Sequence, residues 1–373
     1  MLAPRFLQIH WLTSYPATLL NRDDSGLAKR VPFGDAIRTR VSSQCLKRHW
    51  RTVDDEWALR PSGPEMAVRS RETTEQRILP AMQQAGAGTL EVITATVTAI
   101  AEQLYGDKAS ERSKRLALLL GEPEIRYLSG KAIEIGKAAN DSANVVKKLL
   151  RKEKSNLAAL RQRCVLEAAL EAALFGRVVT SDPEAIADAA IHVAHAFTVH
   201  GAASETDKVV DDLTREAGEA GTADLFDTEL TAGLFYGYVV VDIPLLISNV
   251  GDEAGIGGRV VEHLIHLIAK VSSGATKGST APYSYAEMML VEAGHRQPRT
   301  LANAFRQPVK ALSSAAVAAL SNHMKRVDRT YGLHETRQHL SIDGAALSGS
   351  TLVSLNDLAA FARGIVAAAR ARA

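Results

Sequence analysis

The sequence predicts an α+β protein in which strand-like segments lie before and after a long helical block. Residues 5–13 are rich in aromatic and branched side chains, and residues 234–243 form the most strand-like run of the chain. From about residue 65 to 175, apolar residues instead recur every three or four positions, which is the helical period. With 373 residues, 46% of them hydrophobic, the chain is long enough for two folded regions with their own cores.

Further elements are expected in the following order. Strands are predicted at residues 189–200 and 285–291, and His10 is expected on the surface of the first strand. The helical block should contain helices at residues 90–104, 116–120, 125–135 and 157–174, and the last third should contain helices at 257–271, 301–320 and 356–370. A Gly/Ser/Lys-rich loop at 272–279 lacks the GxxxxGK[ST] order, which argues against an NTPase.

The densest cluster of cations lies between Arg22 and Arg51, where eight Lys or Arg face three acidic residues, a net charge of +5 in a chain whose total is +2. Alternation with Ile37 and Val41 predicts a strand that places Arg38 and Arg40 on one face. Ser42 or Ser43 can cap the following helix, whose first-turn N–H groups suit a phosphate. Four polar residues then share one helix side: Gln44, Lys47, Arg48 and Arg51. The alternative is a solvated surface helix.

Two other segments have strongly biased charge. Residues 108–163 have a net charge of +8, with the tightest cluster at Lys147, Lys148, Arg151, Lys152 and Lys154; this is either a solvated helix face or an extension of an RNA groove. Residues 201–232 form a long polar excursion, and its stretch from Glu205 to Glu229 has a net charge of −7. The excursion is either a protrusion that docks on the basic face of another copy or a disordered acidic loop.

Residues suited to catalysis or metal binding are few. His192, His195 and His200 lie near Asp188, but on a strand His192 and His195 would point to opposite faces. Cys45 and Cys164 have no zinc or disulfide spacing, and no GxSxG or HExxH motif occurs. The sequence therefore predicts a non-catalytic protein without metal or cofactor. No apolar run is long enough for a bilayer, so no membrane partner is expected and a cytoplasmic location is predicted.

Several short motifs, in order along the chain, resemble the CasC family, the backbone subunit of the type I-E CRISPR surveillance complex Cascade. The likeness begins with Asn21-Arg22-Asp23-Asp24 and Arg40-Val41-Ser42-Ser43-Gln44 with Leu46-Lys47-Arg48. It continues through Leu174-Phe175-Gly176-Arg177, Val193-Ala194-His195-Ala196, Val210-Asp211-Asp212-Leu213, Gly233-Leu234-Phe235-Tyr236 and Leu301-Ala302-Asn303-Ala304-Phe305. The ordered series is more specific than any one motif.

The resemblance implies an RRM-like (ferredoxin-like) palm, an inserted helical fingers domain and a protruding thumb. The palm would comprise residues 1–62 and 176–373, the fingers 63–175 and the thumb 201–232. Copies would stack head to tail as a helical filament along CRISPR RNA (crRNA), with other Cascade subunits, in a ribonucleoprotein complex for antiviral defence. The guide, rather than the protein, would recognise target DNA by pairing.

The resemblance also implies contacts to the RNA backbone from Arg22, Lys29, Ser42, Gln44, Lys47, Arg48 and Arg51, which join Arg38, Arg40 and Ser43 as candidate RNA-binding residues. Relatives often have an aromatic pair in the thumb where this chain has Thr206-Asp207-Lys208, so Leu225 and Phe226 are candidates for the wedge that displaces a base. Val178 is a further candidate, or a core residue. Gly237-Tyr238 stands where Arg-Tyr is frequent.

Two other functions remain as alternatives. A metal-dependent nuclease of CRISPR RNA processing would need the histidine cluster to bind a metal ion. A structural protein could instead oligomerise through the acidic excursion without RNA.

Overall fold

The computed structural model describes residues 4–59, 67–105, 109–115, 118–139, 145–146, 174–175, 188–210, 225–250, 254–274 and 280–369. The chain divides into two compact units, which we call the sheet unit and the helical unit. The sheet unit comprises Met1–Ala58, His192–Asp242 and Gly258–Ala369; the helical unit comprises Leu59–Ile191, Ile243–Gly257 and Arg370–Ala373. Among the described helices, none is both long and apolar enough to cross a membrane.

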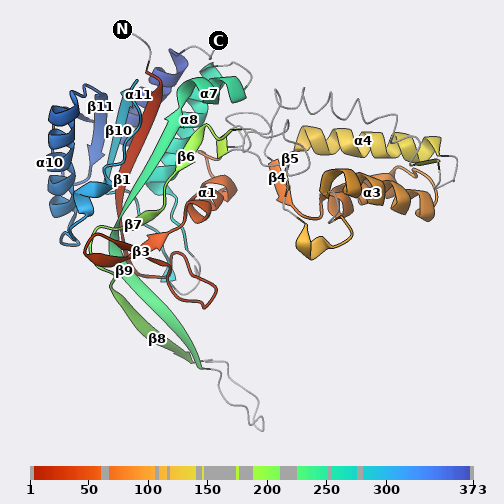
Figure 1. The fold of residues 1–373 in the computed structure, drawn as a ribbon, viewed down its shortest axis with the longest axis horizontal. Helices are drawn as coiled ribbons and strands as arrows, with labels where there is room; N and C mark the ends of the chain where they lie inside the picture. The colour runs from red at the N-terminus through yellow and green to blue at the C-terminus, as the bar shows by residue number, and fades with distance from the viewer. Residues whose placement is uncertain are drawn as a thin grey trace. The chain divides into compact units, whose positions relative to one another are not determined.

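The sheet unit is built on a mixed sheet with the strand order β12-β11-β10-β1-β9-β7-β3-β2 (Figure 1). These strands are β1 (Phe6–Thr18), β2 (Arg30–Phe33), β3 (Ala36–Val41), β7 (Ala196–Thr198), β9 (Leu225–Asp242), β10 (Met288–Gly294), β11 (Thr336–Ser341) and β12 (Thr351–Leu352). The central strand β1 is antiparallel to both neighbours, β9 and β10, whereas β11 and β12 are parallel. A short strand, β6 (Ile191–Val193), also pairs with β9.

The predicted strands occur with shifted ends. The first prediction, 5–13, lies within β1 apart from its first residue, and 234–243 is the second half of the longer β9. The strand predicted at 285–291 begins three residues later, and 189–200 divides into β6 and β7. The surface position predicted for His10 is wrong, because β1 is buried between two other strands and His10 has no exposed area.

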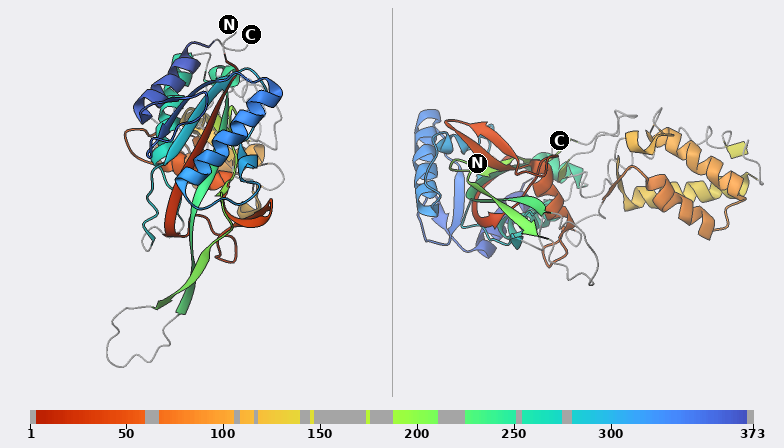
Figure 2. Two further views of the ribbon diagram at one scale, coloured as in Figure 1. Left: turned by 90° about the vertical axis from the view of Figure 1, so that its left-hand side faces the viewer. Right: turned by 90° about the horizontal axis from the view of Figure 1, so that it is seen from below.

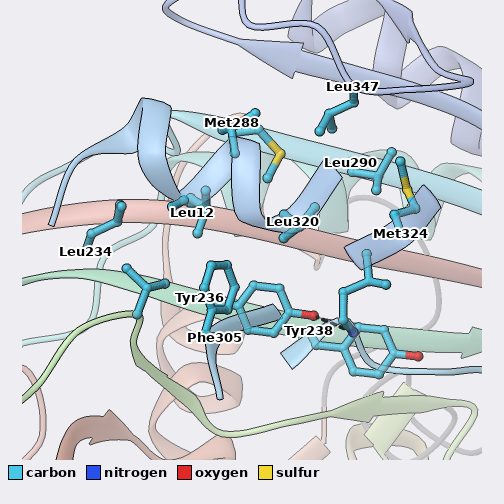
Figure 3. Packing of buried hydrophobic residues seen from close by; sticks show 14 of the residues in the cluster. Leu12, Leu234, Tyr236, Tyr238, Met288, Leu290, Phe305, Leu320, Met324 and Leu347 are labelled. Carbon is cyan, nitrogen blue, oxygen red and sulfur yellow. Dashed lines mark hydrogen bonds between the residues drawn. The ribbon is translucent and has the colours of Figure 1, made fainter. Parts of the chain in front are cut away.

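One face of the sheet packs against η6 (Ala302–Phe305) and α10 (Ser313–Tyr331). Side chains that point to this face from neighbouring strands include Leu12, Tyr236 and Met288, and they meet Phe305 and Leu320 (Figure 3). All five are at least 99% buried, and burial of such side chains supplies about 1.5–3 kcal/mol each. This cluster is the main core on that side of the sheet.

The helix predicted at 301–320 is wrong in part. The chain forms the short η6, leaves the helix, and begins α10 at Ser313. Pro308 explains the break, because proline disfavours the helical conformation at the preceding residue and lacks an N–H donor. Ala316, Val317 and Leu320 keep the apolar spacing of the prediction, but they belong to a helix that continues to Tyr331.

The other face of the sheet is covered by α1 (Ser43–Thr52), α8 (Ala254–Lys270) and α11 (Leu355–Ala367) (Figure 2). The Trp11 ring packs edge-on against Trp50 of α1, with centroids 6.0 Å apart. Gly237 is the partner of Trp11 in β9, and a Cβ at position 237 would lie 2.1 Å from that ring. Only glycine therefore fits beside Trp11. The helices predicted at 257–271 and 356–370 correspond to α8 and α11.

Charged side chains meet inside the sheet unit at Glu292 of β10. Its fully buried carboxylate accepts two hydrogen bonds from Arg299, at 2.9 and 3.0 Å, and one from Arg337 at 2.5 Å. His10 contacts the same carboxylate at 3.1 Å, and Arg337 also reaches Asp328 at 2.5 and 2.8 Å. Burial raises the pKa of Glu292, but hydrogen bonds and charges from His10 and Arg299 outweigh it and hold that pKa below its ordinary value.

A two-stranded hairpin extends from the sheet, formed by β8 (Ser204–Val210) and the first part of β9 (Figures 1 and 2). Ser204 pairs with Thr231 and Val210 with Leu225. The residues between the two strands, 211–224, lie outside the described ranges. The described parts of the acidic excursion, residues 201–210 and 225–232, contain these two paired strands.

The helical unit has a separate apolar core. The helical unit contains the following elements: β4 (Ala67–Ser70), η2 (Thr74–Ile78), α2 (Leu79–Gln84), α3 (Leu90–Tyr105), η4 (Arg112–Lys114), β5 (Leu118–Gly121), α4 (Glu122–Ala138) and α7 (Ile243–Asn249).

Two of the helices predicted in this block, at 90–104 and 125–135, are confirmed as α3 and α4. The helix predicted at 116–120 is wrong, because residues 118–121 pair with β4; a short apolar run fits either structure. The helix predicted at 157–174 lies almost wholly outside the described residues.

Candidate nucleic-acid interface

The start of α1 is where the predicted basic residues meet the sheet. Ser42 has extended dihedral angles (φ −71°, ψ 151°), and its Oγ accepts a hydrogen bond from the Cys45 N–H at 3.3 Å. The Ser42 N–H donates to Asn21 Oδ1 at 2.9 Å. Ser42 is therefore the cap, and Ser43 is the first helical residue; both are buried. The cap fixes the helix start beside the loop that begins at Asn21.

The helix α1 is amphipathic: burial of its apolar side turns its polar side toward solvent. Leu46 and Trp50 are buried. Gln44 and Arg48 are exposed, whereas Lys47 and Arg51 are half-buried and have partners within the protein. Spacings of three and four residues place these polar side chains on one side of the helix, as the sequence predicts: Gln44, Lys47, Arg48 and Arg51.

The loop at residues 21–29 is held in place by hydrogen bonds among its own residues. Asp23 Oδ1 accepts hydrogen bonds from the Ser25 and Leu27 N–H groups at 2.9 and 3.0 Å. The Lys29 N–H donates to the Asn21 carbonyl at 2.9 Å, and Arg22 forms a β-bridge with Ala28. The Asp23 carboxylate is thus used to shape the loop. Both Arg22 and Lys29 are carried on a defined turn.

Several of these cations surround one hollow. It has a volume of about 260 Å³ and is lined by Asp23, Asp24, Lys29, Arg30 and Arg40. We call it the cation hollow. Lys29 and Arg40 were predicted as RNA-binding residues, but Arg30 was not chosen. The pairing of β2 with β3 brings Arg30 opposite Thr39, next to Arg40, and this pairing could not be read from the sequence of one strand.

Arg38 occupies a different environment from Arg40. It has no exposed area, and its guanidinium donates to the carbonyls of Phe33 at 3.3 Å, Thr198 at 3.3 Å and Phe305 at 2.8 Å. The two arginines share one face of β3, as predicted. At Arg38, however, this face is covered by η6, whose Phe305 carbonyl accepts a hydrogen bond from Arg38. A guanidinium committed to buried carbonyls is not available to a phosphate. Its position therefore argues against the predicted role of Arg38 in RNA binding.

The histidines near residue 195 do not converge. His195 Nδ1 lies 2.8 Å from Arg40 Nη1. His200 uses both ring nitrogens, since Nδ1 contacts the Gly201 carbonyl at 2.7 Å and Nε2 accepts from the Leu234 N–H at 3.2 Å. Within the described ranges, no three His, Cys, Asp or Glu side chains are placed to hold a metal ion.

The base of the hairpin is bound to the cation hollow through Glu229. One carboxylate oxygen of this buried residue pairs with the Arg30 guanidinium, and the other accepts a hydrogen bond from the Ala28 N–H at 2.7 Å. Arg30 also donates to Ser204 Oγ at 3.2 Å. In the sequence Glu229 is one of nine acidic residues of the excursion, and nothing marks it as different. The structure shows that it joins β9 to the loop that carries Lys29.

The remaining candidates lie at the edges of the described chain. Leu225 and Phe226 begin β9, where their backbone pairs with Val210 and Val209 of β8. Val178 lies outside the described residues, and so does the tight basic cluster of the helical block, at Lys147, Lys148, Arg151, Lys152 and Lys154.

Comparisons with known proteins agree with this architecture. The sequence family described as "CT1975-like protein" matches residues 7–361. No curated protein matches the chain. Among solved structures, a chain titled "CRISPR RNA-guided surveillance complex, pre-nicking" is similar with a TM-score of 0.76 and 24% identity, covering 96% of this chain and 100% of its own. Another, titled "CRISPR RNA-guided surveillance complex", has a TM-score of 0.70 and 22% identity, covering 98% and 100%. At this identity, the likeness shows a shared fold.

Proposed function

The chain belongs to the CT1975-like protein family, and from this premise we propose that it is a non-catalytic, crRNA-binding backbone subunit of a type I-E Cascade complex. Several copies would assemble head to tail along one guide RNA, together with other subunits of the complex. The guide would then pair with target DNA in antiviral defence. The observation that carries the proposal is the cation hollow beside the start of α1.

The chemistry of this surface suits a phosphate chain. Lys29, Arg30 and Arg40 line one side of the hollow, and α1 begins next to the loop that contributes Lys29. Cations and first-turn N–H groups bind phosphate oxygens without reading bases, so binding should not depend on guide sequence. Arg22, Gln44, Lys47, Arg48 and Arg51 would extend these contacts, with Ser42 and Ser43 shaping the helix start.

The two compact units support an assignment of the family's parts. The sheet unit would supply the palm (1–62 and 176–373), and the helical unit the fingers (63–175). The hairpin of β8 and β9 would be the thumb (201–232). Leu225 and Phe226 stand where its two strands leave the described chain, and we propose them, with Val178, as the residues that displace a base of the guide.

The contacts of the histidines support a role without catalysis. A metal-dependent nuclease would need several free ligand atoms that point to one ion. The ring nitrogens of His200 instead bind backbone groups, and His195 Nδ1 faces a guanidinium. These histidines hold the structure of β7 and its neighbours.

The test is to express the protein with a CRISPR repeat-spacer transcript and its processing partners, and to measure the mass and nucleic-acid absorbance of the leading peak in size exclusion. We expect a large particle that contains an RNA of discrete length. A monomer free of nucleic acid would contradict the proposal. Assembly of equal size without RNA would favour a structural oligomer, and RNA that is degraded upon addition of Mg²⁺ or Mn²⁺ would favour a nuclease.

A further inference from the structure

A second hollow adjoins the cation hollow and differs from it in chemistry. It has a volume of about 430 Å³ and is lined by Arg30, Val31, Pro32, Phe33, Arg40, His195 and Phe197. We call it the aromatic hollow. Arg30 and Arg40 line both hollows, so the two are neighbours around the same pair of cations. The candidate RNA-binding residues named so far leave its aromatic side without a role.

The aromatic side of this hollow is held in position. The Phe33 and Phe197 rings lie 5.0 Å apart between centroids, tilted by 54°, and Phe197 rests edge-on against the buried Tyr236 at 5.9 Å. The Phe33 carbonyl accepts a hydrogen bond from Arg38. The next residue, Gly34, has φ +60° and approaches the Arg306 carbonyl so closely that a Cβ would lie 1.7 Å from its oxygen. Two half-buried rings thus present fixed apolar surface to solvent.

The polar side of the hollow presents hydrogen-bond donors. Arg40 Nε donates to the Arg30 carbonyl at 3.3 Å, and Nη1 lies 2.8 Å from His195 Nδ1. A guanidinium can only donate, so His195 Nδ1 accepts, and the neutral ring carries its hydrogen on Nε2. Burial and the charges of Arg40 and Lys29 lower the pKa of His195, in agreement with a neutral ring. These two contacts use two of the five N–H donors of Arg40.

We propose that the aromatic hollow is a subsite for one unpaired base of a bound RNA strand, whose sugar and phosphate lie in the cation hollow. The proposal rests on the RNA-binding function proposed above and adds a base contact to it. A nucleotide joins a flat ring to an anion, and the two hollows offer aromatic surface and cations side by side. Every base has a π-face, so stacking on Phe33 and Phe197 would tolerate any sequence.

The adjoining charges favour a nucleotide over an apolar side chain of another protein. Arg30 and Arg40 line both hollows, and Lys29 lines the cation hollow. Arg30 is paired with Glu229, whereas Lys29 and Arg40 share the cation hollow with Asp23 and Asp24. Asp23 binds loop N–H groups, and Asp24 lines the cation hollow, where it could accept a hydrogen bond from a ribose 2′-hydroxyl. An apolar side chain would bring no anion to Lys29 and Arg40, whereas the phosphate of a nucleotide would.

The test compares two probes, a short oligouridylate and a ribose-phosphate strand of equal length that lacks bases. The full-length protein and three variants would be titrated with each. Phe33→Leu removes the aromatic face but keeps apolar volume, and Phe33→Trp keeps an aromatic face. Ile37→Ala, in the same hairpin, is the matched control, since Ile37 is 57% exposed and lines neither the cation hollow nor the aromatic hollow. Tryptophan emission would verify folding of each variant.

We expect Phe33→Leu to weaken oligouridylate binding about 5-fold or more while leaving affinity for the abasic strand unchanged. Phe33→Trp and Ile37→Ala should keep the preference for the probe with bases. An equal loss on both probes, or no loss on either, would overturn the base subsite while RNA binding itself stands. Loss of assembly with an unchanged preference would mean that the hollow contacts protein. If the unmodified protein bound neither probe, the RNA-binding function would be overturned as well.

Discussion

The charge network around Glu292 and the cation hollow both depend on arginine, but they use it in opposite ways. At Glu292, Arg299 and Arg337 are bound to carboxylates in the interior of the sheet unit. At the cation hollow, Lys29 and Arg40 face an open space of about 260 Å³. The number of cations in a segment therefore does not identify a binding site. What distinguishes the two regions is whether the cations line an open hollow or are enclosed with carboxylates in the core.

The largest expected effect follows from removal of the charge of Glu292. Glu292→Gln removes the carboxylate shared by the buried Arg337 and the half-buried Arg299, and leaves Asp328 as their remaining carboxylate partner. Loss of one partner of a buried pair costs about 3–5 kcal/mol of the free energy of unfolding. Urea unfolding followed by tryptophan fluorescence would measure it, because Trp11, Trp50 and Trp57, the three tryptophans of the chain, all lie in the sheet unit. Glu262→Gln is the control; Glu262 pairs at 3.0 Å with Arg363, whose side chain is 50% exposed, and should cost less than about 1 kcal/mol. Equal costs would contradict the comparison.

The same network predicts how stability depends on pH. The pKa values of His10 and Glu292 are both lowered in the folded protein, so the unfolded chain binds protons that the folded chain resists. Stability should therefore fall with pH from about 6.5 downward through His10, and further below about 4.3 through Glu292. Urea midpoints measured across this range would show the loss. In Glu292→Gln the decline below about 4.3 should be weaker, and an unchanged acid profile would show that other groups cause it.

An intermediate effect is expected at Arg38, which divides the two regions. Arg38→Met removes the donor shared by the carbonyls of Phe33, Thr198 and Phe305, and buried carbonyls left without partners cost about 1–3 kcal/mol. The same unfolding measurement would detect this. Arg40→Met should change stability less and RNA affinity more. If Arg38→Met weakened RNA binding at a temperature where the variant is folded, Arg38 would belong to the binding surface after all.

The smallest effect on stability is expected on the outer side of α1. Changing Lys47, Arg48 and Arg51 together to Glu should alter the free energy of unfolding by about 1 kcal/mol, because Arg48 is exposed and Lys47 and Arg51 are only half-buried. RNA binding should weaken, and the slope of log affinity against log salt should fall by about 0.7 for each phosphate that the variant no longer binds. The control makes the same charge change at the exposed Lys325, Arg326 and Arg329 of α10. Equal slopes for both variants would remove α1 from the RNA surface.

The sequence predicts local features of the candidate site well because they depend on neighbours along the chain. Alternation of Ile37 and Val41 with the arginines predicts β3, and the pair Ser42-Ser43 predicts the start of α1, which Ser42 caps. The spacing of Gln44, Lys47, Arg48 and Arg51 predicts their common side. None of these needs knowledge of what packs against the element.

Features that depend on distant partners could not be predicted in this way. His10 was expected at the surface because its strand was read alone, but Tyr236 and Glu292, more than 200 residues away, complete its environment. Arg38 and Arg40 have the same sequence signal, and what distinguishes them is the set of carbonyls, from Thr198 and Phe305 among others, that surrounds Arg38. Glu229 was counted with the acidic excursion, although it binds Arg30, which lies 199 residues earlier in the chain. In each case a buried charge finds its partner through the topology of the sheet.

The contact of Gly237 with Trp11 restricts how these two positions can be changed. These two positions face each other across β9 and β1, so a side chain at 237 and an indole at 11 exclude each other. Any exchange that enlarges residue 237 therefore has a required order. Residue 11 can become smaller while glycine remains, whereas residue 237 cannot become larger while tryptophan remains, so a variant enlarged at 237 needs a smaller residue 11 first.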